Sequence, residues 1–399
     1  MDDSFSTGDP VAARLQSLIG QGYLPLPVHP WQWQHYIRHH YAALLATEQL
    51  IYLGPVGDEY LPQVSLRTLS NHDRPGALHI KLPITILNTS CFRGIPGDFI
   101  HCGPELSAWM ASLCAKDAEL QQRGTAVMEE IAGVHVPQVL HNQLDASPYR
   151  YKEMLGATWR QSPASHCKAG ERHMLMAALL QCDESGKSIA SALIEESGIR
   201  PEQWLSELFT AVMVPLYHLL CAYGVGLVAH AQNLTVMLAQ HRPKRVLLKD
   251  FQGDLRVLDS GVAERAGLPA SADVVKRLPS NYLIHDLYTG HCVTVLRFLS
   301  AQLAKEGVIA ELDFYRQLAK VLRDYQGRHP GLAPVFAELN LFAAKIERVC
   351  INRVRLKEGY GDSAQRPVPI VDGFVDNPLY LADCHLKADS ETTLKEVSI

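Results

Sequence analysis

The stretch AHAQNLTVMLAQHRPKRVLLKDFQG, residues 229–253, decides the fold. Two apolar runs, residues 234–238 and 246–248, flank a polar turn at 239–245, and this pattern is typical of a β-hairpin. The two outer ends of an antiparallel pair meet in space. We therefore expect the segments HAQN and KDFQG to lie side by side.

Polar side chains gather where the two ends of this hairpin meet. They are those of His230, Gln232, Asn233, Lys249, Asp250 and Gln252. Sites for nucleoside triphosphates hold magnesium with Asn and Asp and hold phosphates with cationic groups. The pattern therefore predicts such a site, with Asn233 and Asp250 as magnesium ligands. The alternative is a polar hairpin end with ordinary caps.

Composition restricts the class of protein. The 399 residues are 47% hydrophobic and 20% charged, which suits two or three globular domains. The net charge of -5 argues against binding of nucleic acid or a membrane surface. The nine cysteines form no CxxC pair, which favours a reducing compartment and a cytoplasmic location. The apolar stretch 208–229 is expected to be a buried helix to Tyr223, followed by a strand over 225–229.

Two cations are expected on neighbouring strands of the N-terminal half. Residues 63–70 (QVSLRTLS) alternate as in a strand, and residues 79–87 (HIKLPITIL) form a second strand after a turn. The resulting hairpin brings Arg67 close to Lys81. Two neighbouring cations are costly unless an anion lies between them. The alternative is that both side chains point to solvent.

The segment NTSCFRGIPG, residues 88–97, suggests a second anion-binding element. If it begins a helix, Arg93 lies one turn beyond Thr89 and Ser90. Hydroxyls, backbone N–H groups and a guanidinium would then bind a phosphate or carboxylate together. An ordinary capped turn with a solvent-facing arginine is the alternative.

The other elements predict an α+β protein, with an antiparallel β-rich N-terminal half and a helical C-terminal half. Strands are expected at 135–140 and 149–159. Helices are expected at 11–19, 30–46, 106–114, 118–132, 169–182, 201–223, 284–303, 312–323 and 332–356. These elements divide the chain into residues 1–175, residues 176–386 and a disordered tail at 387–399.

Six motifs in order resemble one family, the IucA/IucC-like, NRPS-independent siderophore synthetases. They are HPWQ at 29–32, SLRT at 65–68, IKLPITILNTSCFRG at 80–94, AHAQN at 229–233, LKDFQG at 248–253 and NPL at 377–379. The resemblance implies a fold of fingers (1–175) and palm (176–386). It also implies that the family's N-terminal thumb is missing here, so that a separate thumb partner is expected.

The resemblance assigns roles to individual residues. Those that resemble the family's ATP-binding residues are Ser65, Arg67, Thr68, Lys81, Thr89, Ser90, Arg93, His230, Asn233 and Asp250. Asn233 and Asp250 would hold Mg²⁺, and His230, Arg93 and Lys81 would act in catalysis. The family commonly has an acidic residue two places before the histidine of HAQN, where this chain has Val228.

The resemblance also implies an activity. Family members adenylate a carboxylate with ATP and then condense it with an amine or hydroxylamine, and they often form homodimers. The sequence looks most like members that act on succinyl-hydroxamates of N-hydroxy-diamines, of the desferrioxamine, bisucaberin and alcaligin type. The alternatives are a citrate–amine ligase of the aerobactin type and a non-catalytic domain. A kinase-like phosphotransferase is a further alternative, although Gln232 stands where a kinase needs a catalytic carboxylate.

Overall fold

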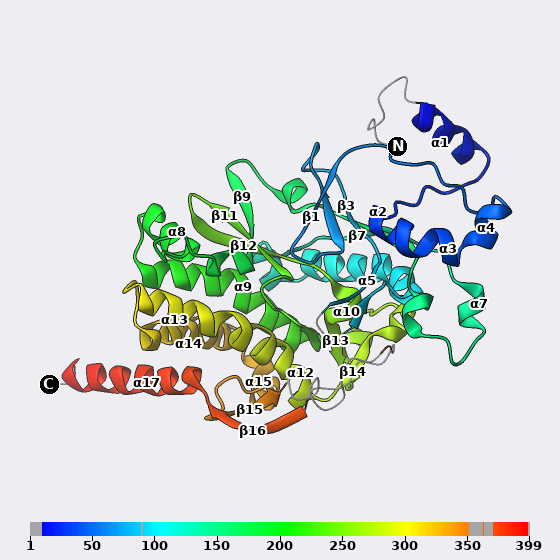
Figure 1. The fold of residues 1–399 in the computed structure, drawn as a ribbon. Coiled ribbons are helices and arrows are strands. Elements are labelled where there is room, and N and C mark those ends of the chain that lie inside the picture. Colours follow the sequence, from blue (N-terminus) through cyan, green and yellow to red (C-terminus); the bar gives the residue numbers. More distant parts are fainter. Residues whose placement is uncertain (1–9, 89–90, 351–361, 363–369, 398–399) are drawn as a thin grey trace. The chain divides into compact units, whose positions relative to one another are not determined.

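The computed structural model describes residues 10–88, 91–350, 362 and 370–397 (Figure 1). The chain divides into two compact units, each built from segments distant in the sequence. Unit 1 comprises Met1–Glu105, Glu129–His166 and Asn352–Val368, and unit 2 comprises Leu106–Met128, Cys167–Ile351 and Pro369–Ile399. The boundary expected at residue 175 thus falls after His166, and residues 106–128 belong to the second unit.

Unit 1 contains a five-stranded antiparallel sheet in the order β1-β2-β3-β8-β7. Its strands are β1 (Tyr60–Pro62), β2 (Thr68–Asn71), β3 (His79–Lys81), β7 (Glu130–His135) and β8 (Gly156–Arg160). A separate hairpin pairs β4 (Ile84–Asn88) with β5 (Cys91–Arg93). The antiparallel β-rich character expected of the N-terminal half is confirmed.

The helices of unit 1 are short. They are α1 (Pro10–Gly20), α2 (Pro30–Gln32), the π-helix η1 (Trp33–Ile37), α3 (Arg38–His40), α4 (Ala42–Ala46), α7 (Val139–Asn142), and the 3-10 turns η2 (Tyr149–Lys152) and η3 (Pro163–His166). The helices expected at 11–19 and 30–46 are therefore confirmed, the second with a break at Tyr41. The strand expected at 135–140 is wrong, because β7 ends at His135 and α7 follows.

Two strand predictions in unit 1 need correction. The strand expected at 63–70 begins only at Thr68, because Leu66 takes a left-handed backbone (φ 63°) and the SLR segment forms a turn between β1 and β2. The strand expected at 79–87 is divided at Leu82 and Pro83, since proline has no N–H to donate to a ladder. The helical start expected after Asn88 is strand β5 instead.

Unit 2 is built around α9 (Pro201–Tyr223), which has the bounds expected from the sequence. Pro201 suits the first helical turn, and Gly224 ends the helix in a left-handed conformation (φ 64°) that favours glycine. The helix is apolar and long enough to cross a membrane by composition, but its side chains are mostly buried in the core of unit 2. It packs on strand β12 (Arg242–Leu248) and on helix α14 (Glu311–Arg328) (Figure 1).

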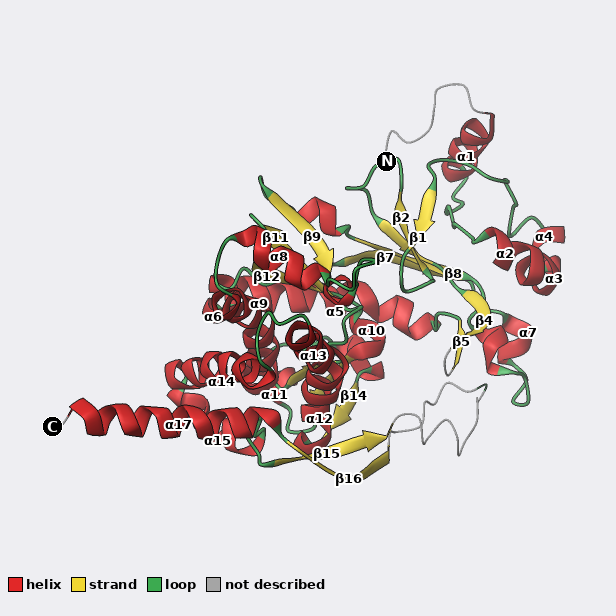
Figure 2. Ribbon diagram, turned by 60° about the vertical axis from the view of Figure 1, so that its left-hand side comes forward, coloured by secondary structure: helices red, strands yellow, loops and turns green. Residues whose placement is uncertain are grey.

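Unit 2 also contains three small sheets (Figure 2). One has the order β6-β12-β11-β9, with β6 (Ala126–Val127), β9 (Glu171–Leu175) and β11 (Leu234–Ala239). The second has the order β10-β13-β14, with β10 (Val225–Leu227), β13 (Leu255–Leu258) and β14 (Lys276–Leu278). The third pairs β15 (Lys345–Cys350) with β16 (Ile370–Asp376).

The remaining elements of unit 2 are mostly helices. They are α5 (Gly97–Lys116, which begins in unit 1), α6 (Ala118–Gln122), η4 (Met176–Leu180), α8 (Ile189–Ser197), α10 (Phe251–Asp254), α11 (Val262–Arg265), η5 (Ala270–Val274), α12 (Ser280–Leu287), the π-helix η6 (Tyr288–Leu296), α13 (Arg297–Lys305), η7 (Pro330–Leu332), α15 (Ala333–Glu338) and α17 (Pro378–Val397). Four expectations are wrong here. The helix expected at 118–132 ends at Gln122, and the helix expected at 169–182 is replaced by strand β9 and the turn η4. The helix expected at 332–356 gives way to strand β15 at residues 345–350, and the tail expected to be disordered is helical to Val397.

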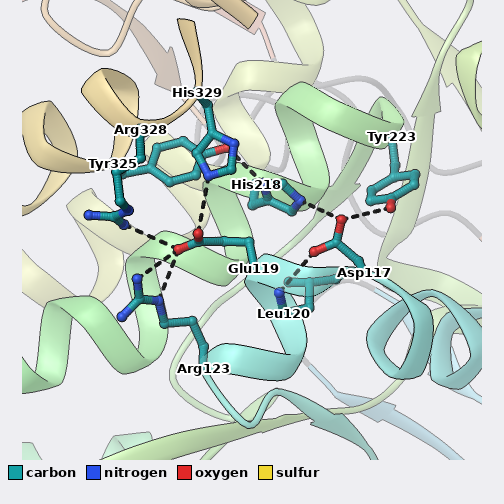
Figure 3. A network of polar contacts seen from close by, with 9 residues as sticks. All are labelled: Asp117, Glu119, Leu120, Arg123, His218, Tyr223, Tyr325, Arg328 and His329. Atoms are coloured by element: carbon teal, nitrogen blue, oxygen red, sulfur yellow. Dashed lines mark hydrogen bonds and ion pairs between the residues drawn. The ribbon is translucent and has the colours of Figure 1, made fainter. Parts of the chain in front are cut away.

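A closed polar network joins α6, α9 and α14 inside unit 2 (Figure 3). His218 lies 2.8 Å from the Tyr325 hydroxyl through Nδ1 and 3.0 Å from an Asp117 carboxylate oxygen through Nε2. Glu119 accepts hydrogen bonds from Arg123, at 2.9 Å, and from Arg328, at 3.2 Å, and its other oxygen lies 3.1 Å from His329 Nε2. This network is a structural feature of the helical core.

Candidate functional site

The hairpin predicted at the centre of the chain is present as β11 and β12. Its turn is shorter than expected and consists of Gln240 and His241, which both adopt positive φ as a two-residue hairpin turn requires. At the opposite end Leu234 pairs with Leu248, so HAQN and KDFQG do meet. We call this meeting point the hairpin rim and define it by His230, Asn233, Lys249, Asp250 and Asp254.

Asn233 connects the two sides of the hairpin rim. Its amide Nδ2 donates to a carboxylate oxygen of Asp254 at 2.8 Å and lies 3.4 Å from the Val228 carbonyl oxygen. His230 Nε2 lies 3.9 Å from the same Asp254 oxygen. An imidazole, a carboxamide and a carboxylate therefore converge, and the side chains of His230 and Asp254 are each about one third exposed, at 33% and 31%.

Asp254 is the functional candidate that the sequence reasoning missed. Asp250 begins the short helix α10 in a left-handed conformation (φ 64°), and one helical turn later Asp254 reaches Asn233. The pairing of Leu227 with Leu255 puts Asp254 beside Val228, whose N–H donates to the Asp254 carbonyl oxygen at 2.9 Å. A return strand after KDFQG was the signal that could have identified it. Asp254 also supplies a carboxylate close to Val228, since Asn233 Nδ2 contacts both the Asp254 carboxylate and the Val228 carbonyl oxygen.

A second acidic group lies behind the hairpin rim. Asp286 on α12 is 3% exposed and forms an ion pair with Arg256 on β13. Burial raises the pKa of Asp286 to about 7, although Arg256 opposes this rise, and the charge of Asp254 adds to it. Arg256 thus pairs with the buried carboxylate of Asp286. In the sequence it lies two residues after Asp254, the carboxylate at the hairpin rim.

Three cations predicted to bind phosphates, Arg67, Lys81 and Arg93, belong to unit 1. Thr68 pairs with Lys81 across β2 and β3, and the Leu82 N–H donates to the Arg67 carbonyl oxygen at 2.9 Å, so the backbones of Arg67 and Lys81 lie one register position apart. The Arg67 guanidinium donates to the carbonyl oxygen of Gly94. Gly94 follows Arg93 directly in the sequence. The Arg67 guanidinium therefore contacts the backbone next to Arg93, the third of these cations.

The β4–β5 hairpin carries the second anion-binding element. Arg93 lies opposite Ile84 in the strand pairing, and its Nη2 lies 3.3 Å from the Asn88 side-chain oxygen. The helical geometry expected for Arg93 is therefore replaced by a strand, which still directs the guanidinium toward the hairpin tip. Thr89 and Ser90, at that tip, lie outside the described residues.

Two hydroxyl groups of the SLRT segment suit a ligand. The oxygens of Ser65 and Thr68 are buried and have no hydrogen-bond partner among the described residues. Buried hydroxyls normally have a partner, because an unmade hydrogen bond costs about 1–3 kcal/mol. Hydroxyls beside Arg67 and Lys81 are a suitable donor set for phosphate oxygens.

Unit 1 also contains a cavity of about 520 Å³. Its lining includes Asp98, His101, His135, Tyr149 and Glu153. The cavity adjoins the strand of Arg93, because the N–H of Ile95 donates to the Glu153 carbonyl oxygen at 3.2 Å. Its size and polar lining suit a small polar molecule.

The hairpin rim fits a magnesium ion chemically. Mg²⁺ at nucleotide sites uses one or two protein carboxylates and takes its other ligands from phosphates and water. Asp254, the side-chain oxygen of Asn233 and Asp250 provide hard oxygen donors of this kind. Among the described residues no group of three or more His, Cys, Asp or Glu side chains is arranged to hold a metal ion.

The fold and site define a class before any comparison: a two-unit α+β protein with a polar hairpin rim in one unit and a set of cations in the other. Two family models match parts of the chain. Residues 6–181 match the family model described as IucA / IucC family, and residues 202–363 match that described as Ferric iron reductase FhuF-like transporter.

Individual relatives extend over nearly the whole chain. Aerobactin synthase of Escherichia coli is 47% identical over 364 residues, which is 91% of this chain and 63% of that protein. The structure of aerobactin synthetase IucC from a hypervirulent pathotype of Klebsiella pneumoniae is 43% identical with a TM-score of 0.79, covering 94% of this chain and 64% of that one.

A third likeness concerns the fold alone. ATP-bound aerobactin synthetase IucA from the same pathotype is 18% identical with a TM-score of 0.69, over 89% of this chain and 61% of that one. The chain therefore spans a little under two thirds of the length of these relatives. The chain belongs to the IucA/IucC family of NRPS-independent siderophore synthetases.

Proposed function

We propose that this protein is an ATP-dependent ligase that joins a carboxylic acid to an amine in siderophore biosynthesis. The observation that carries the proposal is the convergence of His230, Asn233 and Asp254 at the hairpin rim. The relatives, which are named as aerobactin synthases, support the same chemistry.

ATP is the proposed activating substrate. The cations Arg67, Lys81 and Arg93 and the hydroxyls of Ser65 and Thr68 would bind phosphate oxygens through charge-assisted hydrogen bonds. Thr89 and Ser90 are proposed as further phosphate donors. His230 and Asn233 would contact the nucleotide from the hairpin rim. ATP is also the ligand named for IucA, a solved structure of similar fold.

The reaction is proposed to have two steps. A carboxylate oxygen of the acid attacks the α-phosphorus of ATP, the bond to the β-phosphate oxygen breaks, and pyrophosphate leaves. The amine nitrogen then attacks the acyl carbon, an amide forms, the nitrogen loses a proton, and AMP leaves with the electron pair of the acyl–oxygen bond. Lys81, Arg93 and His230 stabilise the negative charge that moves onto phosphate oxygens. Bound magnesium, held by Asn233, Asp250 and Asp254, would neutralise phosphate charge.

The substrate class is proposed from the relatives and the cavity. The 47% identity to aerobactin synthase favours a citrate-type acid over the succinyl-hydroxamate that the sequence motifs suggested. We propose that the amine binds in the unit 1 cavity, because carboxylates hold ammonium groups and both Asp98 and Glu153 line it. Asp98→Asn should then raise the KM for the amine several-fold and leave the KM for ATP unchanged, and equal shifts in both constants would contradict this placement.

A single assay series tests the function. The wild-type chain is given ATP, magnesium, one acid of each type and a panel of amines and hydroxylamines, and pyrophosphate, AMP and ADP are measured. Pyrophosphate and AMP that depend on the acid support the ligase, whereas ADP supports a phosphotransferase. His230→Ala should lower the rate about a hundredfold or more. Absence of ATP binding in calorimetry, with the chain folded, would favour a non-catalytic role or a need for a thumb partner.

A further inference from the structure

We propose that His291 is a positioning residue that holds the peptide in front of His230 and so fixes the direction of the His230 side chain. The inference rests on the proposed function for its effect on rate, but its structural effect can be measured separately. It starts from a fully buried imidazole that the reaction described above does not use.

The contact itself is defined by one hydrogen bond. His291 is 0% exposed, and its Nδ1 lies 2.8 Å from the carbonyl oxygen of Ala229, the residue before His230. A carbonyl oxygen only accepts, so the ring proton must be on Nδ1. Burial lowers the pKa of His291 to about 4, although the bond to Ala229 opposes this, so the ring is neutral at pH 7.

The other ring nitrogen indicates that packing alone does not account for a histidine at this position. Nε2 of His291 is buried and has no hydrogen-bond partner among the described residues. A buried polar atom without a partner costs free energy, so a leucine of similar size would be the cheaper choice for packing alone. We infer that the Nδ1 contact to Ala229 compensates for this cost by its effect on the loop.

The helices α12 and η6 together contact both backbone groups of Ala229, its N–H and its C=O, which belong to successive peptide groups. The Ala229 N–H is directed at the Asp286 carbonyl oxygen at 3.5 Å, so α12 and η6 receive both backbone groups of this residue. A Cβ on Gly290 would lie 3.2 Å from the Ala229 nitrogen, which shows how closely the helix approaches the loop. Gly290 and His291 lie in the π-helix η6, and π-helical turns recur at functional sites.

Only one bond separates the held peptide from the Cα of His230. The loop beyond it is fixed by the Asn233 N–H, which donates to the His230 carbonyl oxygen at 2.9 Å. Release of the Ala229 carbonyl would therefore rotate the His230 side chain relative to Asp254 rather than unfold the loop. A shift of about 1 Å in a reacting group lowers rates by up to about a hundredfold.

The experiment compares three substitutions of His291 in the full chain. His291→Leu keeps the volume and removes the donor, His291→Asn puts an amide N–H near the position of Nδ1, and His291→Gln puts one near Nε2. We expect the Leu and Gln variants to lose roughly tenfold to a hundredfold in kcat with a smaller change in the KM for ATP, and the Asn variant to recover most of the loss. Equal losses in all three variants would overturn the proposal.

A double-mutant cycle separates positioning from general damage. In a His230→Ala background, adding His291→Leu should lower kcat hardly any further, because the effect of His291 on kcat acts through His230. The matched control is His218→Leu, another buried histidine of unit 2, whose contacts are to Asp117 and Tyr325. Its effect should be the same in both backgrounds. Additive losses for His291→Leu would overturn the proposal.

A spectroscopic readout keeps the proposal testable without turnover. In the NMR spectrum of histidine-labelled protein, the His230 signal is assigned by its loss in His230→Ala. We expect that signal to shift in His291→Leu and to stay in place in His291→Asn and His218→Leu. An unchanged signal in His291→Leu contradicts the positioning role. If the wild-type chain forms no pyrophosphate, the ligase function is contradicted. If the His230 signal nevertheless shifts in His291→Leu, the positioning role is still supported.

Discussion

Unit 2 holds two groups of acidic and histidine side chains that differ in how completely they are paired. In the network of Figure 3, Asp117 and Glu119 receive hydrogen bonds on each of their oxygens, and the side chain of Glu119 is 6% exposed. At the hairpin rim, Asp254 receives one bond from Asn233, lies 3.9 Å from His230, and is 31% exposed. The first group is closed, whereas the second is open to solvent.

The difference separates a structural role from a ligand-binding one. A buried carboxylate is tolerated when its partners outweigh the loss of water, and this is the state of Asp117 and Glu119. A carboxylate that remains partly exposed keeps lone pairs for a ligand or a metal ion. Three observations would test this contrast: stability, rate and the response to pH.

The largest effect is expected from opening the closed network. Glu119→Gln removes the buried carboxylate that contacts Arg123, Arg328 and His329, and it leaves Arg123, whose side chain is 17% exposed, without this charged partner. Loss of one partner from such a group costs about 3 kcal/mol of unfolding free energy. Urea denaturation followed by circular dichroism measures this loss. The turnover per folded molecule should stay close to wild type, and a large fall in turnover would remove the contrast between the two groups.

The reverse behaviour is expected at the hairpin rim. Asp254→Asn keeps the volume but removes the charge next to His230 and Asn233, so we expect kcat/KM to fall about tenfold to a hundredfold. Because the side chain is partly exposed, the urea midpoint should change little. Asp259→Asn is a suitable control, since Asp259 follows β13 in the same unit. Equal rates in the Asp254 and Asp259 variants would exclude a role for Asp254.

The stability that Glu119 contributes to the closed network should depend on pH. Burial opposes the charged form of Glu119, but His329, Arg123 and Arg328 outweigh it and hold its pKa below the usual range. A lowered folded-state pKa contributes stability above the unfolded pKa, and this contribution is lost as pH falls through the folded pKa. The stability gap between wild type and Glu119→Gln should therefore narrow between pH 7 and pH 3. Urea midpoints at both pH values check this, and a gap that widens in acid would contradict it.

The sequence predicted the elements that are defined by residues close together in the chain, namely helix α9 and the β11–β12 hairpin. Helix α9 has the expected bounds because a proline at its start and a glycine at its end are decisive signals. The β11–β12 pair was found because its two strands are separated by a short polar turn. The meeting of His230 and Asn233 with the KDFQG segment follows from the β11–β12 pairing alone.

Elements that depend on distant partners were not predictable in the same way. Residues 171–175 form an edge strand because they pair with β11, more than fifty positions away, and the apolar run around them equally suits a helix. Asp254 was missed because its position depends on the pairing of β10 with β13. The turn at Arg67 was missed because an alternating pattern gives no sign of the left-handed residue Leu66.

The smallest effect is expected at the far end of the β11–β12 hairpin, where the turn residues Gln240 and His241 both have positive φ. Side chains with a Cβ are strained there, and Asn-Gly is the preferred pair for such a turn. The double substitution Gln240→Asn, His241→Gly should raise the unfolding free energy by about 0.5–1 kcal/mol. The bond from Trp204 Nε1 to the His241 carbonyl oxygen, at 2.9 Å, uses the backbone and is retained. Because the turn lies at the opposite end of the strands from the hairpin rim, kcat should not change, and a fall in kcat would mean that the hairpin transmits strain along its length to His230.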